Sequence, residues 1–531
     1  MRYFNTEGIC KPDVHYMVRL DNRLREIRRL YIDRGKYFVI NRGRQYGKTT
    51  TLMALADDLK DAYAVLPMDF QRISSSSFAD EHVFSEKFIE YFERLFLQRE
   101  HLKEYLCQDA VRALTEQKNK GSVSMDLLFA GLSRLCGTAK RPVVLMIDEV
   151  DSASCHEVFI EFLAQLRAYY LDRENSPLFH SVILAGVYDI KNLKRRIRPD
   201  KERRYNSPWN IAADFDMDMS FSAVQIQKML EEYEADRHTG MQVAAVADEI
   251  EQYTSGYPYL VSAICKVMDE KLLDTLFATS SEDIWTREGI GEAVKMLLDK
   301  RLPLFDSMMR QISEYPDLKQ MLYAMLFQGE TFAYNPDHPV IELACMFGYM
   351  KNSNKTVQVA NRMFEMRLYN LFLSEQELSS TMSRLAKREK NQFIKEGKLD
   401  MYRVLEKFTE YFEDIYGSKG DKFLEDSGRR LFLLYLKPII NGVGNYYIES
   451  QTRDARRTDV IVDYLGEQFV IEMKIWHGNE YHERGERQLA GYLDDYRLKK
   501  GYLLSFHFGK NKKPGIKKVR IGDKTIIEAV V

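Results

Sequence analysis

The sequence predicts an α/β protein of several domains, with a parallel sheet in its N-terminal half and a smaller α/β unit at its C-terminal end. Three apolar runs, at 36–41, 143–147 and 180–187, alternate with helical patterns, as strands of a parallel sheet covered by helices do. Residues 220–300 are helical in pattern. Because 531 residues exceed what one hydrophobic core usually supports, we expect at least three packed units.

Composition excludes several classes of protein. With 45% hydrophobic and 29% charged residues the chain is an ordinary globular protein, and its net charge of −2 creates no global field that attracts nucleic acid. Six cysteines without CxxC pairs predict a reducing compartment and no zinc site. No signal peptide and no apolar run near the roughly 18 residues of a membrane span are found, so a cytoplasmic protein without membrane contact is expected.

The first motif lies between a strand and a helix. A helical pattern over 21–35 precedes the strand at 36–41, and the loop RGRQYGK, residues 42–48, then leads into a helical pattern over 49–61. Strand, glycine-bearing turn and helix follow in the order of a phosphate-binding loop, although Arg42 stands at its first glycine position. An exposed basic turn is the alternative.

Each part of such a loop has a chemical task. Backbone N–H groups at the helix N-terminus hold phosphate oxygens, Lys48 adds a positive charge on the terminal phosphates, and the Thr49 hydroxyl coordinates Mg²⁺. Gly47 lets the backbone approach the ligand closely. The residues expected to bind the nucleotide are Arg44, Gln45, Tyr46, Gly47, Lys48, Thr49 and Thr50.

A second element strengthens the nucleotide interpretation. The buried strand 143–147 ends in Asp148 and Glu149, at the carboxyl end where parallel sheets bind ligands. Asp148 is expected to hold Mg²⁺ through water, and Glu149 to orient or deprotonate the attacking water. The alternative is an acidic turn that caps the helix at 157–171.

The third apolar run is followed by a basic stretch. Arg195, Arg196 and Arg198 come after the strand at 180–187 and could reach a γ-phosphate in the same chain or in a neighbour. A solvated basic face is the alternative, so the identity of any arginine finger stays open.

These motifs carry a family resemblance up to about residue 275. The stretches YFNTEG, HYMV, GKYFVINRGRQYGKTTTL, VLMIDEVD, LAGVYDIKNLK, SPWNIA and SGYPYLVSAIC resemble the AAA-ATPase-like family of bacterial ATP-binding proteins, relatives of the STAND-type ATPases. The resemblance implies that arginine at position 42 is compatible with a nucleotide site. It also implies that Gly256 and Pro258 start a lid helix that faces the nucleotide, whereas a plain turn with proline at the first helical position is the alternative.

The C-terminal part holds a second candidate site. Residues 456–476 read as two apolar strands joined by a turn, with Asp459 entering the first strand and Glu472 and Lys474 on one face of the second. Buried charges cost several kcal/mol per uncompensated ion, so these groups need a cation, a proton or each other. A divalent ion held by Asp459 and Glu472 is one solution, with Lys474 stabilising a phosphate. A Lys474–Glu472 salt bridge is the simpler one.

The layout from about 420 to 510 resembles the PD-(D/E)XK nuclease superfamily. The resemblance places Asp459, Glu472 and Lys474 on its motif positions, while Gln488 and Tyr492 match the QxxxY helix of one branch. Either Glu425 or Glu449 is the leading acid. The basic tail at 510–520 either tracks phosphates or is a solvated loop.

Together these observations predict four domains. They are a P-loop ATPase core (1–220), a helical lid (221–300), a winged-helix-like domain (301–380) and a PD-(D/E)XK nuclease-like domain (400–531). The expected function is an ATPase whose nucleotide state regulates a Mg²⁺-dependent nuclease, with ATP and Mg²⁺ as cofactors, DNA as partner and homo-oligomers compatible with the sequence. A STAND-like regulatory switch, whose C-terminal domain binds nucleic acid or a partner without cleavage, is the alternative. Whether the nuclease is active, its substrate and the stimulus stay open.

Overall fold

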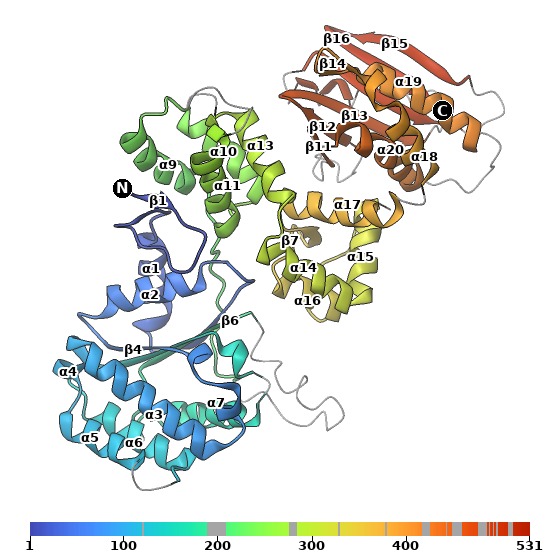
Figure 1. The fold of residues 1–531 in the computed structure, drawn as a ribbon. Helices are drawn as coiled ribbons and strands as arrows, with labels where there is room; N and C mark the ends of the chain where they lie inside the picture. Colours follow the sequence, from blue (N-terminus) through green and yellow to red (C-terminus); the bar gives the residue numbers. More distant parts are fainter. Residues whose placement is uncertain are drawn as a thin grey trace. The chain divides into compact units, whose positions relative to one another are not determined.

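The computed structural model of the chain divides into two compact units (Figure 1). Unit 1 holds Met1–Arg237, Gly256–Lys266 and Cys345–Gly348, and unit 2 holds His238–Ser255, Val267–Ala344 and Tyr349–Val531. The residues that the structure describes are 1–118, 122–154, 156–187, 209–274, 284–327, 330–377, 380–416, 425–441, 443–448, 459–475, 486–487, 489–491, 493–494, 498–507 and 513–531. The four-domain division stays a prediction.

Unit 1 is built on a four-stranded parallel sheet. Its strands are β3 (Tyr37–Asn41), β4 (Ala64–Asp69), β5 (Val143–Asp148) and β6 (Ser181–Gly186), in the order β3-β6-β5-β4. Three of these strands correspond to the predicted apolar runs. The sequence analysis missed β4, which contains Pro67, and proline argues against a central strand. β4 lies at the sheet edge, where a missing backbone N–H is tolerated.

Helices cover both faces of this sheet (Figure 1). Residues of α1 (Asp21–Ile27) and α2 (Lys48–Leu59) share one core with Phe38 and Val65 of the strands. On the other face, Val39 and Leu66 belong to a second core with further helices. Those helices are α3 (Glu81–Gln98), α4 (Glu100–Tyr105), α5 (Gln108–Gln117), α6 (Met125–Gly137) and α7 (Glu157–Leu171). The alternation of strand side chains thus feeds two cores.

The N-terminal segment of unit 1 is fixed to helix α9 (Ala223–Arg237). It forms the short parallel strands β1 (Tyr3–Phe4) and β2 (His15–Tyr16). The Phe4 ring centroid lies 5.2 Å from that of Tyr16 and 5.0 Å from that of Tyr233 on α9. Arg2 adds ion pairs to the same helix, so aromatic and charged contacts together hold β1 and β2 against α9.

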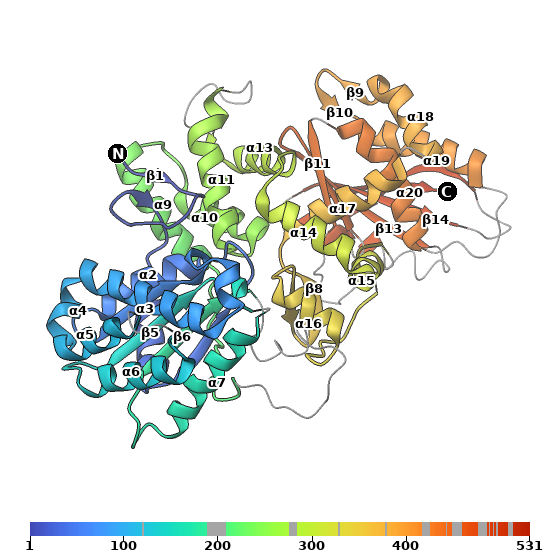
Figure 2. The same cartoon turned by 60° about the horizontal axis from the view of Figure 1, so that its bottom comes forward.

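Unit 2 begins with a helical region. Its helices are α10 (Val243–Thr254), α13 (Arg287–Leu298), α14 (Pro303–Glu314), α15 (Pro316–Phe327), α16 (Pro339–Met346), α17 (Arg362–Glu377) and α18 (Thr381–Glu389), while α11 (Pro258–Lys271) runs from unit 1 into unit 2. Helices α14–α17 gather around the antiparallel hairpin of β7 (Met350–Ser353) and β8 (Thr356–Val359) (Figure 2). None of the helices over the described residues has the length and apolar content needed to cross a membrane.

The C-terminal part of unit 2 is a mixed six-stranded sheet with the order β11-β12-β13-β14-β16-β15. Its strands are β11 (Gly444–Ile448), β12 (Asp459–Tyr464), β13 (Glu467–Ile475), β14 (Lys500–Phe506), β15 (Gly515–Ile521) and β16 (Lys524–Val530); it is preceded by β9 (Ile394–Lys395), β10 (Lys398–Leu399), α19 (Met401–Tyr416) and α20 (Glu425–Ile440). The β13–β14 and β14–β16 pairs are parallel. The hairpin expected over 456–476 is thus present as β12 and β13.

Because side chains alternate along each strand, the two faces of this sheet pack against different residues. Phe506 of β14 packs on the helical side, since a Cβ on Gly428 of α20 would lie 2.4 Å from its ring and the Phe412 ring of α19 lies 5.4 Å away. On the opposite face, a Cβ on Gly501 would lie 2.9 Å from Leu493. Glu472, in register with Leu503, shares the face of Gly501 because strand side chains repeat every two residues.

Candidate functional site

The phosphate-binding loop connects β3 to α2 at the carboxyl end of the sheet. Gly47 precedes α2 and has a φ of 76°, a conformation that side chains rarely adopt, so glycine is required there. Gln45 also has a positive φ, of 58°. Arg42 does not have a positive φ. The position that usually holds the first glycine therefore has no backbone need for it in this chain.

The Arg42 side chain instead binds the loop to residues 215–217, which follow the last strand of the sheet in sequence. Its guanidinium donates hydrogen bonds to the backbone carbonyls of Asn41 at 2.9 Å, Phe215 at 3.2 Å and Met217 at 2.7 Å. The guanidinium also lies 5.5 Å from the Phe215 ring centroid. Burial lowers the pKa of Arg42. The arginine thus closes the loop against residues 215–217 with hydrogen bonds that glycine cannot make.

Lys48 is the cation of the site. It is buried, and its Nζ donates hydrogen bonds to the carbonyls of Arg42 at 2.9 Å and Gly43 at 3.0 Å. Burial lowers the pKa of Lys48, against which the carboxylates of Asp151, Glu149 and Asp148 favour its charged form. Lys48 Nζ therefore donates to backbone carbonyls of the loop in this structure, and phosphate oxygens of a bound nucleotide could replace these carbonyls as acceptors.

The acids belong to the end of β5 and the turn after it. Burial raises the pKa of Asp148, whose carboxylate accepts hydrogen bonds from the Thr49 side chain and from the Glu149 N–H at 2.9 Å. Burial also raises the pKa of Glu149, and the neighbouring Asp148 carboxylate raises it further. A carboxyl with a raised pKa accepts a proton more readily, which suits a general base.

A cavity of about 470 Å³ opens beside the loop. All seven predicted loop residues, Arg44 to Thr50, line it, as do Glu149 and Pro258. Asp148 lies behind Thr49, to which it is hydrogen-bonded. Pro258 begins α11. Every predicted residue of the nucleotide site is therefore brought together by the structure, either on the cavity wall or directly behind it.

The sequence analysis missed two parts of this site. Asp151 lines the cavity, accepts a hydrogen bond from the Val187 N–H at 2.7 Å and occupies the space beside Gly186, where a Cβ would lie 2.8 Å from its Oδ1. Its signal was the third acid of the DEVD run. The second part is the N-terminal segment, which contributes Ile9, Met17 and other residues to the wall. Its motif YFNTEG had carried only the family resemblance.

The second candidate site lies on the β12–β13 hairpin. Glu472 is fully buried, Lys474 is 9% exposed, and Lys474 Nζ lies 3.1 Å from Glu472 Oε1. The backbone of Asp459 pairs directly with that of Glu472. The salt-bridge alternative for Lys474 is thus realised in this structure, with Asp459 at the adjacent position of the neighbouring strand. The sequence analysis missed Glu528 of β16, which is fully buried and forms an ion pair with Lys517 at 2.6 Å.

Other predicted residues fall outside what the structure describes. They are Arg195, Arg196, Arg198, Glu449, Gln488 and Tyr492. Glu425 begins α20. Of the basic tail at 510–520, residues 513–520 are described, and 515–520 belong to the edge strand β15. Within the described parts of the chain, no three His, Cys, Asp or Glu side chains gather as a metal site.

The donors at both sites are chemically suited to Mg²⁺. Thr49 and Asp148 present a hydroxyl and a carboxylate at the nucleotide cavity, and Glu472 presents a buried carboxylate in unit 2. Oxygen ligands are what Mg²⁺ prefers, usually with one or two protein carboxylates beside water and substrate phosphates. Burial raises the pKa of Asp148, while the hydrogen bond from Thr49 and the charge of Lys48 act in the opposite direction.

A glycine-bearing loop between a parallel strand and a helix, with a lysine facing an acidic strand end, defines a P-loop nucleotide-binding protein. Comparison with models of protein families matches residues 11–365 to the AAA-like domain. The match covers more than half of the chain, and the chain belongs to this family. It is an ATP-binding, AAA-like ATPase. The comparison with curated proteins gave no match.

Three proteins of solved structure show a distant likeness to this chain. The Walker-type ATPase of Pyrococcus abyssi is 12% identical with a TM-score of 0.47, over 69% of this chain and 99% of its own. ORC2 of Aeropyrum pernix with ADPNP and ADP is 15% identical with a TM-score of 0.39, over 71% and 98%. ORC1 of the same organism, in complex with DNA, is 12% identical with a TM-score of 0.30, over 67% and 93%. Nothing about the chemistry of this chain follows from them.

Proposed function

We propose that this protein is a cytoplasmic ATPase whose nucleotide state regulates an attached Mg²⁺-dependent nuclease domain acting on DNA. The nuclease domain begins near residue 400 and is of the PD-(D/E)XK kind. The observation that carries the nuclease part is the Glu472–Lys474 pair, buried on a strand whose neighbour places Asp459 directly opposite Glu472.

In the nucleotide site, we propose that the N–H groups of residues 44–50 hold the phosphates and that Lys48 moves from the loop carbonyls to the terminal phosphates. Thr49 and Asp148 are the candidate Mg²⁺ ligands. Glu149 orients or deprotonates the attacking water, for which the raised pKa caused by its burial is suited. Pro258 and the apolar N-terminal wall, including Ile9 and Met17, enclose the base.

In the nuclease site, Asp459 and Glu472 are the candidate Mg²⁺ ligands and Lys474 stabilises the charge that develops on the phosphate. Bound Mg²⁺ supplies Lewis-acid activation of the phosphodiester and of water. Gln488 is proposed as a further catalytic residue by its place in the QxxxY pattern. Support for the arrangement comes from the fully buried Glu472 carboxylate, whose partner Lys474 lies two residues further along the same face.

The test uses the purified full-length chain with supercoiled, linear and single-stranded DNA in Mg²⁺ or Mn²⁺, with and without ATP. Metal-dependent cleavage that disappears in Lys474→Ala and in Glu472→Gln is expected. Lys437→Ala is a matched control, because the ion pair of Lys437 is with Glu377, at 3.2 Å. If every DNA form stays intact under all these conditions, the nuclease part of the proposal is wrong.

A regulatory switch without cleavage is the second candidate. In this case the C-terminal domain binds nucleic acid or a partner, and the 3.1 Å Lys474–Glu472 ion pair is a structural contact. The exposed basic residues Lys517, Lys518 and Arg520 on β15 favour contact with an anionic partner. Titration of the full-length protein with Mn²⁺ separates the two candidates. Tight binding lost in Asp459→Ala supports chemistry at the hairpin, whereas its absence supports a binding domain.

A further inference from the structure

Two short segments of unit 1 that continue directly into unit 2 contact the phosphate-binding loop. The Tyr257 hydroxyl donates a hydrogen bond to the Arg44 carbonyl, and its ring meets that of Tyr46 edge-on at 4.6 Å. A Cβ on Gly43 would lie 2.7 Å from the Phe347 carbonyl oxygen, so this backbone packs directly on the loop. A change in the shape of the loop on phosphate binding would therefore alter the contacts of Tyr257 and of Phe347.

Ser255 and Gly256 connect helix α10 to Tyr257 along the chain. Ser255 and Gly256 have φ values of 44° and 68°, and the Gly256 carbonyl accepts a hydrogen bond from the Phe221 N–H at 2.8 Å. Any Cβ on Gly256 would lie 2.0 Å from the Phe221 carbonyl oxygen. Lys351 of β7 donates to the Ser255 hydroxyl at 3.2 Å. Since a residue other than glycine keeps this region of φ only where its surroundings hold it, the conformation of Ser255 depends on its neighbours.

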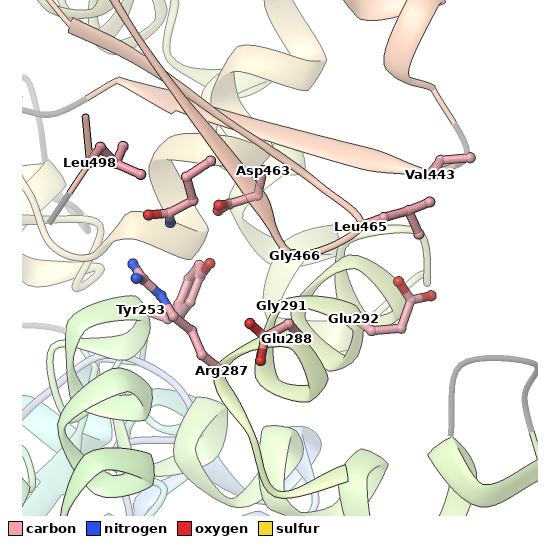
Figure 3. A pocket seen from close by; sticks show the side chains of 11 residues that line it. Tyr253, Arg287, Glu288, Gly291, Glu292, Val443, Asp463, Leu465, Gly466 and Leu498 are labelled. Atoms are coloured by element: carbon pink, nitrogen blue, oxygen red, sulfur yellow. The ribbon is translucent and has the colours of Figure 1, made fainter. Parts of the chain in front are cut away.

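Tyr253, in the last turn of α10, reaches the β12–β13 hairpin of unit 2. It is 5% exposed and lines a cavity of about 200 Å³ together with Arg287 of α13 and Asp463 of β12. Figure 3 shows Tyr253 and Arg287 on the helical side of this cavity and Asp463 on the strand side. Polar groups of the helices and of the hairpin therefore line this cavity, beside the apolar Val443, Leu465 and Leu498.

Charges from three helices converge on Asp463. Burial raises the pKa of Asp463, with Arg287 and Arg362 acting in the opposite direction. The Arg362 guanidinium of α17 lies 5.3 Å from the Tyr253 ring centroid, and Arg287 Nε lies 3.5 Å from Glu249 Oε2 of α10. Because Tyr253 and Asp463 also interact electrostatically, a shift of α10 changes the energy of the Asp463 carboxylate.

Asp463 and the candidate nuclease residues belong to the same hairpin. Asp463 pairs with Gln468, and Asp459, four residues earlier on β12, pairs with Glu472. Four residues of strand span about 13 Å. The hairpin is held by β11 and β14 on either side, so a displacement at Asp463 is transmitted along β12 instead of being absorbed by a loose loop.

We propose that Tyr253 and Asp463, which line one cavity, carry the state of the nucleotide site to the β12–β13 hairpin, with Tyr257 and the Ser255–Gly256 joint as the connecting segment. This inference rests on the proposed function, because it names the regulation of the proposed nuclease site. The nucleotide-free and nucleotide-bound loops prefer different positions of Tyr257, and the hairpin follows through α10. Such coupling is a difference in binding free energy between two states and is reciprocal between the sites.

Hydrogen exchange of the full-length protein, with and without the Mg²⁺ complex of a non-hydrolysable ATP analogue, tests the route. In the wild-type protein the analogue is expected to change exchange of the hairpin amides, residues 460–474, by at least about fivefold, the lower end of usual coupling between sites. Tyr253→Phe and Asp463→Asn are each expected to reduce this response below about twofold, while analogue affinity changes by no more than about fivefold because the coupling is reciprocal. Glu292→Gln is the matched control, since Glu292 lines the same cavity but pairs with Lys295 at 3.3 Å.

The proposal is overturned if the hairpin does not respond in the wild-type protein, if both variants keep the full response, or if the Glu292→Gln control loses it as well. Unfolding of each variant is measured beside exchange, and Asp463→Asn, at a partly exposed position, guards against a Tyr253→Phe variant that fails to fold. DNA cleavage is assayed in parallel. A protein that shows the exchange response and no cleavage loses the proposed nuclease activity but keeps the coupling.

Discussion

Replacing Arg42 with glycine restores the usual pattern of a phosphate-binding loop, and we predict that it damages this protein. By sequence pattern alone, Arg42→Gly looks like an improvement. In the structure the Arg42 guanidinium satisfies the carbonyls of Phe215 and Met217 and covers the Phe215 ring. Its backbone lacks the positive φ that would reward glycine. The substitution therefore removes contacts and gains no relief of strain.

The expected loss follows from these contacts. A hydrogen bond to a charged group contributes about 1.5–3 kcal/mol, and a cation–π contact about 0.5–2 kcal/mol. Glycine adds about 0.5–1 kcal/mol of backbone entropy. Against this stands the cost of burying the guanidinium, which the lowered pKa of Arg42, caused by burial, also reflects. The net destabilisation of unit 1 by Arg42→Gly is expected to be about 2–4 kcal/mol.

Denaturant unfolding of the full-length protein, monitored by the fluorescence of Trp209 in the unit 1 core, measures the change. Arg44→Gly is the matched control, because Arg44 is exposed in the same loop, and it is expected to cost less than about 1 kcal/mol. ATP affinity should fall in Arg42→Gly, since the loop is no longer held to residues 215–217. If Arg42→Gly were as stable as the wild-type protein or more stable, the contacts of Arg42 would not stabilise the loop.

Three further predictions concern the charged groups. Lys48→Ala should lower ATP turnover, measured by phosphate release, by on the order of 100-fold or more. Lys60 is exposed, and Lys60→Ala is the control in which turnover should not change. Unaltered turnover in Lys48→Ala would show that residues 42–48 are not a phosphate-binding loop. Lys474→Ala should destabilise unit 2 by about 3 kcal/mol or more, because the buried Glu472 carboxylate loses the Lys474 ammonium group. The double variant Lys474→Met, Glu472→Gln should recover most of this loss in thermal unfolding. If it does not, the cause of the loss is not electrostatic. Since burial raises the pKa of Asp463, the folded protein holds this proton more tightly than the unfolded chain, so its unfolding free energy should rise as pH falls through the folded-state pKa, until about 3.9. Asp463→Asn should remove this part of the pH dependence, and identical pH profiles would contradict it.

Local sequence signals were sufficient where chemistry and periodicity agree. Strands β3, β5 and β6 are short apolar runs that end in polar or glycine residues, so their position and direction were readable. Edge strand β4 was not, because Pro67 reads as a break and only the sheet order shows that it is tolerated. The helices between 81 and 137 likewise carry no motif that would have placed them on one particular face.

Site residues were predictable in the same way. Lys48, Thr49 and Asp148 belong to patterns in which chemistry dictates spacing, and the structure brings them together around one loop. Asp151 and the wall around Ile9 depend on contacts between distant segments, which no local pattern encodes. The role of Arg42 is of this second kind, because its partners Phe215 and Met217 lie more than 170 positions away along the chain.

The two candidate sites differ in their balance of charge. At the nucleotide cavity one lysine faces three carboxylates, and burial raises the pKa of both Asp148 and Glu149, so the site gains when a cation arrives with the phosphates. On β13, Glu472 and Lys474 neutralise each other within 3.1 Å. Lys474 must leave that ion pair before it can act on a phosphate.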